Sequence, residues 1–197
     1  MENMRFELEN GQSIKVYRDE DAENPWDEFG VHLWDIVSNR RNVADYINHG
    51  CNARWVLEKF FDNRAKQGAS EFETRDYLMT AVYMYEHSGT TISLSPFNCP
   101  WDSGIGYVAY IDKNECRKLN GGEWNRKKAM RFLEYGVKQM DAWLQGDCYG
   151  YELYDENGDW IDGCCGFYGW DELICYLRDE LGKNIAEKVE NSCKYGF

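Results

Sequence analysis

The sequence is short of positive charge. Lysine and arginine together number 22 against 35 aspartates and glutamates, which gives a formal net charge of −13. Contacts to phosphates need clustered lysine and arginine, so this balance argues against direct nucleic-acid binding and against docking on an anionic membrane. An acidic chain attracts basic partners instead, although negative charge also serves solubility alone.

Other familiar signals are missing as well. No run approaches the roughly 18 apolar residues of a membrane helix, and the opening MENMRFELEN lacks the basic and apolar regions of a secretory signal. The chain has eight cysteines but no CxxC pair, so the usual spacing of a structural zinc site is absent. We therefore expect a protein of the reducing cytoplasm, without metal or cofactor, whose thiols mostly fill the core.

Alternating polarity and glycine turns predict several strands. Residues 4–9 and 13–18 alternate around Asn10-Gly11, which is typical of a hairpin. A second hairpin is expected at 149–155 and 159–165, across Asn157-Gly158. Further strands are expected at 30–37, 78–86, 90–94 and 105–111.

Apolar residues recur at helical spacing in the remaining segments. The clearest helix is expected from Asn125 to Leu144, after a short one capped by Asp112. Two more are expected at about 170–181 and 185–193, and the pattern is also helical from Asn42 to about Lys66, within a possible helical insertion at residues 36–70. Because successive strands are joined by short turns, we predict a single α+β domain over residues 1–197, with helices packed on an antiparallel sheet.

The negative charge is concentrated in two blocks. Tyr17–Asp35 holds seven acidic residues and one basic residue, and Asp147–Glu180 holds ten and one. Side by side, these blocks would form a surface with phosphate-like charge density that fits a basic nucleic-acid channel; separately, they would be solvated faces. The residues predicted to contact a basic partner are Asp19, Glu20, Asp21, Glu23, Asp27, Glu28, Asp155, Glu156, Asp159 and Asp162.

Two other segments, Ser95–Tyr107 and Asp162–Trp170, combine aromatic rings, thiols and glycines. Such a mixture is typical either of a pocket rim or of a tightly packed part of the core. A pocket would stack a base or a sugar, and its candidate residues are His87, Ser88, Cys99, Trp101, Asp102, Tyr107, Phe167, Tyr168 and Trp170. Cys99 with His87 and Asp102 also allows nucleophilic catalysis, but no catalytic residue is assigned.

Several of these motifs resemble a family of uncharacterised proteins from tailed bacteriophages and prophages. The resemblance rests on His87-Ser88-Gly89, Ser95-Pro96-Phe97, Cys99–Gly104 and Gly166–Gly169, and it covers about residues 14–170. The chain departs from the family in residues 36–70 and after Gly104, where the family usually carries a glutamine. The resemblance implies an accessory phage protein that acts in the cytoplasm of an infected or lysogenic bacterium.

The charge and the resemblance together predict an inhibitor of bacterial defence. It would bind a basic nucleic-acid-binding surface on a CRISPR effector or a restriction enzyme, without contacting nucleic acid or membrane itself. The alternative is a protein that binds or sequesters a nucleotide signal in the aromatic and glycine pocket. A virion or replication accessory protein is a third reading, and self-association is left open.

Overall fold

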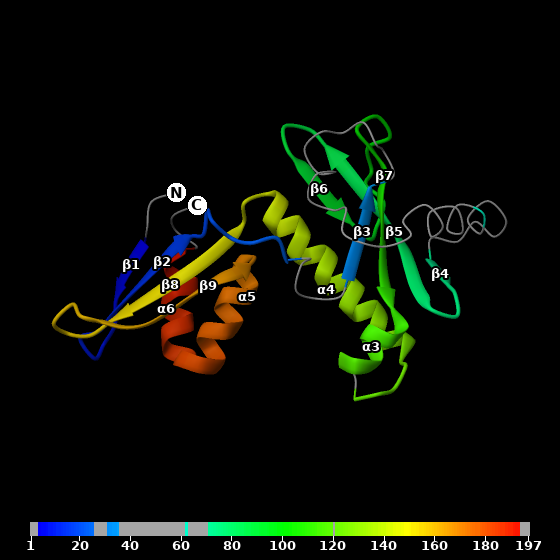
Figure 1. Cartoon of the computed structure of the whole chain (residues 1–197). Coiled ribbons are helices and arrows are strands. Elements are labelled where there is room, and N and C mark those ends of the chain that lie inside the picture. The colour runs from blue at the N-terminus through cyan, green and yellow to red at the C-terminus, as the bar shows by residue number, and fades with distance from the viewer. Residues whose placement is uncertain (1–3, 26–30, 36–61, 63–70, 120, 194–197) are drawn as a thin grey trace. The chain divides into compact units, whose positions relative to one another are not determined.

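The computed structural model describes residues 4–25, 31–35, 62, 71–119 and 121–193 (Figure 1). Contacts divide the chain into two compact units, of which unit 1 comprises Met1–Glu23 and Ala142–Phe197 and unit 2 comprises Asn24–Asp141. Each unit is built on its own antiparallel sheet, which confirms the predicted α+β class.

Two predictions about domain organisation remain open. The division by contacts does not test whether the whole chain folds as a single domain, so that statement stays a prediction. The helical insertion predicted for residues 36–70 lies outside the described residues, apart from Asp62.

Unit 1 contains a four-stranded sheet in the order β1-β2-β8-β9. The predicted N-terminal hairpin is confirmed as β1 (Met4–Glu7) and β2 (Ser13–Arg18), and the second hairpin as β8 (Cys148–Tyr154) and β9 (Trp160–Tyr168). Gly158 turns the second hairpin with a φ of +87°, which a residue with a side chain rarely adopts. β2 pairs with β8, so two strands far apart in the sequence join the hairpins into one sheet.

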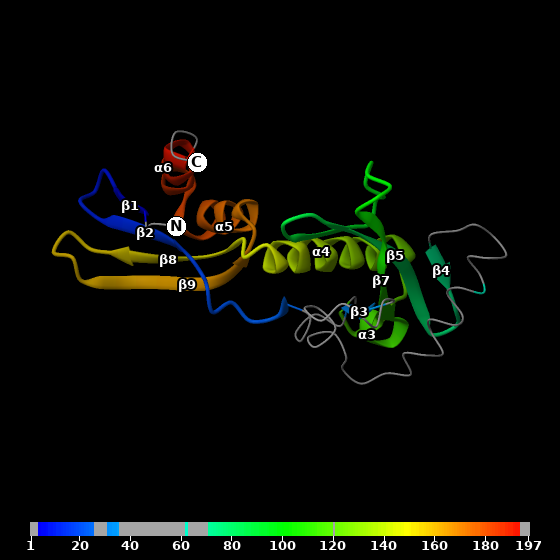
Figure 2. The ribbon, with the colours of Figure 1, turned by 90° about the horizontal axis from the view of Figure 1, so that it is seen from above.

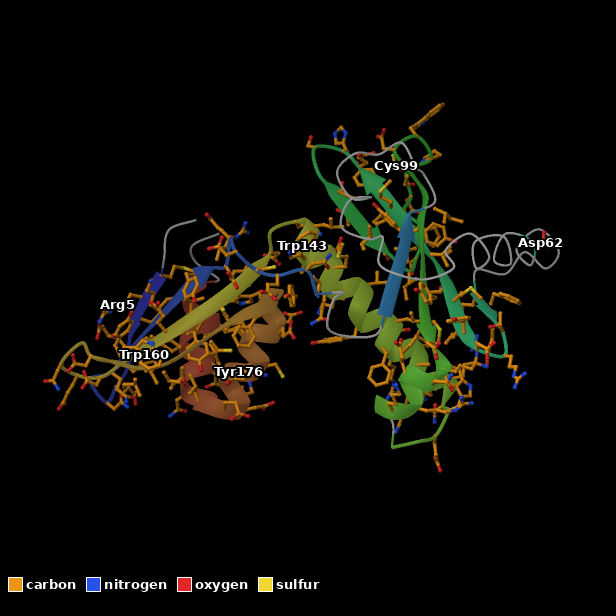
Figure 3. The ribbon with its side chains drawn as sticks, in the orientation of Figure 1. Arg5, Asp62, Cys99, Trp143, Trp160 and Tyr176 are labelled. Carbon is orange, nitrogen blue, oxygen red and sulfur yellow. The ribbon has the colours of Figure 1, made fainter. Side chains whose placement is uncertain are left out.

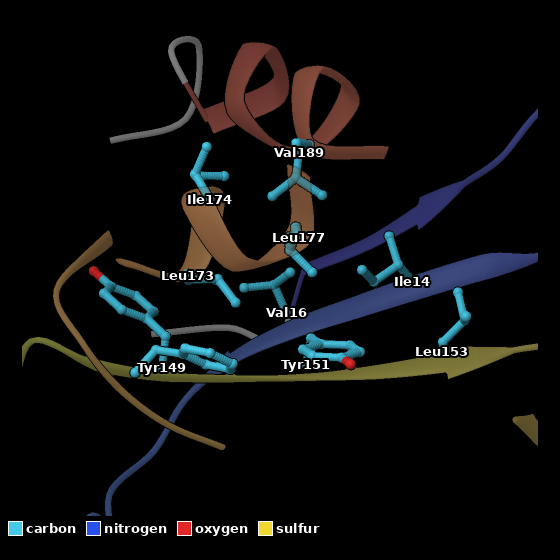
Figure 4. Packing of buried hydrophobic residues seen from close by; sticks show 11 residues of the cluster. Ile14, Val16, Tyr149, Tyr151, Leu153, Leu173, Ile174, Leu177 and Val189 are labelled. Carbon is cyan, nitrogen blue, oxygen red and sulfur yellow. The ribbon is translucent and has the colours of Figure 1, made fainter. Parts of the chain in front are cut away.

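The C-terminal helices cover one face of this sheet (Figure 2). They are α5 (Trp170–Tyr176), a π-helical turn η2 (Leu177–Leu181) and α6 (Lys183–Cys193), which confirms the two helices predicted there. Alternate residues of β2 and β8 meet these helices in the core of unit 1 (Figure 4). The largest side chains that are fully buried there are Ile14, Tyr151, Leu173 and Leu177. The period of two in the strands therefore puts every second residue under the helices.

Unit 2 contains the sheet β3-β7-β5-β4, with β6 also paired to β5. Its strands are β3 (Val31–Asp35), β4 (Glu71–Glu73), β5 (Tyr77–Glu86), β6 (Thr90–Ser93) and β7 (Ser103–Asp112). The sequence predicted all of these strands except β4, because a segment of three residues is too short to show an alternation of polar and apolar side chains.

Two helices follow β7 in the sequence. α3 (Lys113–Leu119) begins at the predicted cap, where the Asp112 carboxylate accepts the N–H of Asn114 at 2.6 Å. α4 (Arg126–Leu144) begins beside Asn125, whose side chain accepts the N–H of Lys128 at 3.0 Å. Among the described residues, no helix is long and apolar enough to cross a membrane.

Candidate functional site

The acidic segment, residues 19–23, directly follows β2 in unit 1. The N–H of Asp19 donates to the carbonyl of Cys148 at 2.9 Å, and its carboxylate accepts the N–H of Gly166 at 3.0 Å. Gly166 has a φ of +81° and lies where the β8–β9 register shifts, so its N–H needs a partner outside the ladder. Asp19 therefore stabilises the irregular part of β9.

The other carboxylates of the acidic segment are exposed. Glu20, Asp21 and Glu23 face solvent, while the backbone that carries them is held in place. The Tyr168 hydroxyl donates to the carbonyl of Glu23 at 2.6 Å, and the Trp143 indole N–H donates to the carbonyl of Ala22 at 2.9 Å. These three carboxylates are available for a partner. Two further predicted residues, Asp27 and Glu28, lie outside the described residues.

The acidic turn, residues 155–159, joins β8 to β9. The carboxylate of Asp155 accepts the N–H of Asp159 at 2.8 Å and that of Asn157 at 2.9 Å. These bonds, chiefly that from Asp159, hold the pKa of the Asp155 carboxyl below its usual value. Asp155 thus shapes the turn, whereas the carboxylates of Glu156 and Asp159 are exposed to a partner.

Asp162 also has a partner within the chain. Its carboxylate accepts the Tyr151 hydroxyl at 2.9 Å. Burial first, and then this hydrogen bond, raise the pKa of the Tyr151 hydroxyl. Of the predicted contact residues, Asp19, Asp155 and Asp162 therefore serve the fold of unit 1 directly.

The acidic segment and the acidic turn lie at opposite ends of β8. The strand register pairs Arg18 with Tyr149 and Ser13 with Tyr154, so the residues after Arg18 and those after Tyr154 leave the sheet at opposite ends. The seven residues of β8 separate the two groups by roughly 20 Å at about 3.3 Å per residue. The acidic segment and the acidic turn therefore do not merge into one face along the sheet. The acidic segment does lie beside another part of the second block, since it bonds to Gly166 and Tyr168.

The net charge is divided very unequally between the units. Unit 1 contains 19 acidic residues against 7 lysines and arginines, a net charge of −12, and unit 2 contains 16 against 15, a net charge of −1. From Asp155 to Leu177 the sequence has no lysine or arginine at all. Nearly all the excess negative charge of the chain thus belongs to one folded unit.

On the sheet face opposite the helices, lysine and arginine side chains lie beside carboxylates. The ammonium of Lys15 lies 2.8 Å from the Glu152 carboxylate and lowers the pKa of Glu152. Lys15 also lies over the ring of Tyr17, at 5.3 Å from its centre. Sequence reasoning did not identify these residues. The alternation in β2 and β8 was the available signal, but only the register shows that Lys15 and Glu152 face each other.

A cavity of about 340 Å³ lies beside the acidic segment, and its walls include Asp19, Glu20, Trp143 and Cys148. Burial, and next the charge of Asp19, raise the pKa of the Cys148 thiol to about 11. The thiol therefore stays protonated at neutral pH, and Cys148 is a poor nucleophile. Arg18 also lines this cavity, so its walls carry both signs of charge and do not favour a cation over an anion.

The aromatic residues proposed for a ligand pocket fall in both units. Tyr107 is 2% exposed in unit 2, and Phe167 is 7% exposed in the core of unit 1. Trp170 packs edge-on against Tyr149 at 5.1 Å between ring centres, and Tyr168 bonds to the acidic segment. In these four residues, the rings serve packing and backbone positioning.

The remaining candidate pocket residues lie in two turns of unit 2, one of which carries Cys99, labelled in Figure 3. His87 and Ser88 are exposed between β5 and β6, and Trp101 is 91% exposed before β7. The Cys99 thiol lies 3.7 Å from the exposed Asp102 carboxylate. A carboxylate does not supply the cationic surroundings that activate a cysteine. The ligand-pocket and nucleophile hypotheses stay predictions.

Comparisons with known protein families, with curated proteins and with solved structures found no match. Within the part of the chain that the structure describes, no group of three or more histidine, cysteine, aspartate and glutamate side chains is placed to hold a metal ion. The resemblance to phage proteins stays a prediction.

Proposed function

We propose that this protein is an acidic, non-catalytic inhibitor that binds a basic nucleic-acid-binding surface on a bacterial defence protein. The observation that carries the proposal is the division of charge, with a net −12 on unit 1 and −1 on unit 2. Negative charge on a folded surface speeds encounter with a basic site and disfavours acidic partners. The bacterial host, and a CRISPR effector or restriction enzyme as target, come from the sequence resemblance alone.

The contact residues in this proposal are the exposed carboxylates of the two groups. In the acidic segment they are Glu20, Asp21 and Glu23, and in the acidic turn they are Glu156 and Asp159. None of these five side chains is needed to cap the turn or the irregular part of β9. Their charge can therefore be reversed at small cost to the fold.

The test compares charge reversal in the two units. One variant carries lysine at Glu20, Asp21 and Glu23, and a matched variant carries lysine at three exposed acidic residues of unit 2, namely Asp76, Glu123 and Glu134. Affinity for a panel of purified CRISPR effectors and restriction enzymes is measured by calorimetry at several salt concentrations.

We expect the unit 1 variant to bind about tenfold more weakly or worse and the unit 2 variant to bind within about twofold of the parent. Affinity of the parent should also fall as salt rises. Equal losses in the two variants, an affinity that ignores salt, or no binding to any basic effector would each contradict the proposal.

A further inference from the structure

β9 forms an open edge of the unit 1 sheet. Among the residues that the structure describes, β9 pairs with β8 alone, and the sheet ends there. An edge strand presents N–H and C=O groups on its outer side, which can pair with another extended chain. The N–H of Gly166 already bonds to Asp19, and that of Tyr168 to Glu172, so the part of β9 left for pairing is Trp160–Cys165.

Large apolar side chains are exposed at the start of this edge, where Trp160 is labelled in Figure 3. Trp160 is 63% exposed and Ile161 is 41% exposed. The indole of Trp160 lies over Gly163, because its nitrogen is 3.3 Å from the position that a Cβ on Gly163 would occupy. The absence of a side chain at Gly163 thus leaves room for a flat aromatic surface beside the edge. Exposed tryptophan of this kind is a frequent anchor in protein interfaces.

Negative charge stands at both ends of the edge. The acidic turn precedes Trp160, and the acidic segment packs against the end of β9 through Asp19 and Glu23. Because β9 pairs along the seven residues of β8, the two groups are the same roughly 20 Å apart along it. The acidic segment and the acidic turn therefore do not form one face, but they lie at the two ends of one strand.

We propose that the open edge of β9 accepts an extended segment of the partner protein as an added strand, with lysine or arginine near both ends of that segment. This inference rests on the proposed function and specifies how the basic partner binds. Register shifts on either side of Asp162–Cys164 limit the regular backbone pairing to a few residues. The partner strand is therefore held by three contributions together: short backbone pairing, apolar contact with Trp160 and Ile161, and charge at the ends.

Charge selects this occupant over a second copy of the same chain. Pairing β9 with β9 of another copy would bring together two units of net charge −12. It would place acidic turns beside acidic segments without a lysine or arginine from 155 to 177 to offset them. Like charges so close to one another oppose association.

The probe is a synthetic ten-residue peptide with lysines at both ends and alternating valine and threonine in the centre. Its control has the same side chains, but alternate central backbone nitrogens are methylated and cannot donate hydrogen bonds. Binding of both peptides to the full chain is measured by fluorescence anisotropy, and amide hydrogen exchange in the protein is followed by NMR. We expect the unmodified peptide to bind at least tenfold more tightly and to slow exchange within Trp160–Cys165.

Two variants with the same added charge separate the edge from general electrostatics. Ile161→Lys puts a lysine on the edge, whereas Cys175→Lys puts one on the exposed surface of α5. We expect the first to weaken peptide binding at least fivefold and the second to weaken it less than twofold.

Three results would overturn the inference about the edge. The first is that the two peptides bind equally and the two lysine variants lose equal affinity for the peptide. In that case, if the unit 1 charge reversal still weakens effector binding, the proposed function stands and only the added strand is refuted. The second is no binding of either peptide. The third is a dimer of the parent chain in light scattering that Ile161→Lys converts to monomer, since the edge would then pair with itself.

Discussion

The hydrogen bond from Gly166 to Asp19 allows a direct separation of structural from partner-binding carboxylates. Asp19→Ala removes the acceptor of the Gly166 N–H, which has no place in the β8–β9 ladder. Leaving a buried donor without a partner costs about 1–3 kcal/mol. Gly166 is only half-buried, so water replaces part of the lost bond. We therefore expect the free energy of unfolding to fall by about 1–2 kcal/mol.

Two controls accompany Asp19→Ala. Asp19→Asn keeps a side-chain oxygen that can accept the same N–H, and we expect it to lose less than about 1 kcal/mol. Glu20→Ala removes an equal charge from the neighbouring exposed residue and should change stability by less than about 0.5 kcal/mol. The assay is urea unfolding, with hydrogen exchange at the Gly166 amide as a local readout. If Asp19→Ala and Glu20→Ala are equally mild and exchange at Gly166 is unchanged, the assignment of Asp19 to the fold is wrong.

Three further predictions concern the core and sheet of unit 1. A Cβ added by Gly150→Ala would lie 2.5 Å from Cζ of Tyr17. We therefore expect the free energy of unfolding in urea to fall by about 1 kcal/mol, and we expect no such fall in a Tyr17→Ala background. A fall that persists in that background would refute the clash. The raised pKa of Tyr151 favours its protonated form in the folded state, so its contribution to stability is complete below about pH 10 and is lost as pH rises further. Tyr151→Phe should reduce the loss of stability at alkaline pH. A stability-versus-pH profile that this substitution leaves unchanged would contradict the role assigned to Tyr151. Leu173→Ala empties a fully buried position and should cost about 2–5 kcal/mol in thermal or urea unfolding, whereas Cys175→Ala on the same helix should cost far less; comparable losses would show that Leu173 is not in the core.

Most local structure could be predicted because its causes are local. The Asn10-Gly11 and Asn157-Gly158 pairs favour hairpin turns, and both hairpins are present. The Asp112 carboxylate caps a helix as its position before α3 predicts. The three residues of β4, Glu71–Glu73, were missed because pairing with β5 rather than any period in the sequence makes them a strand.

The candidate site could be predicted only in part. The excess of carboxylates in residues 17–35 and 147–180 is visible in the sequence, and so are Trp160 and Ile161 beside a turn. The sequence does not distinguish Asp19, bonded to Gly166, from the exposed Glu20 next to it. That distinction depends on the register of β2, β8 and β9, and a shift of one residue would turn every side chain to the other face.

By itself, the amino-acid sequence determined the composition of charge, the turns, the helix caps and the antiparallel α+β class, because each depends on neighbouring residues. Only the tertiary structure decided that β2 pairs with β8, and with it that residues 1–23 and 142–197 share one strongly acidic unit. The same pairing places the acidic segment and the acidic turn at the two ends of β9. The physical reason is that pairing between distant strands is selected by the burial of whole faces, such as Ile14 and Tyr151 under Leu173, and no local pattern specifies which distant strand supplies the partner.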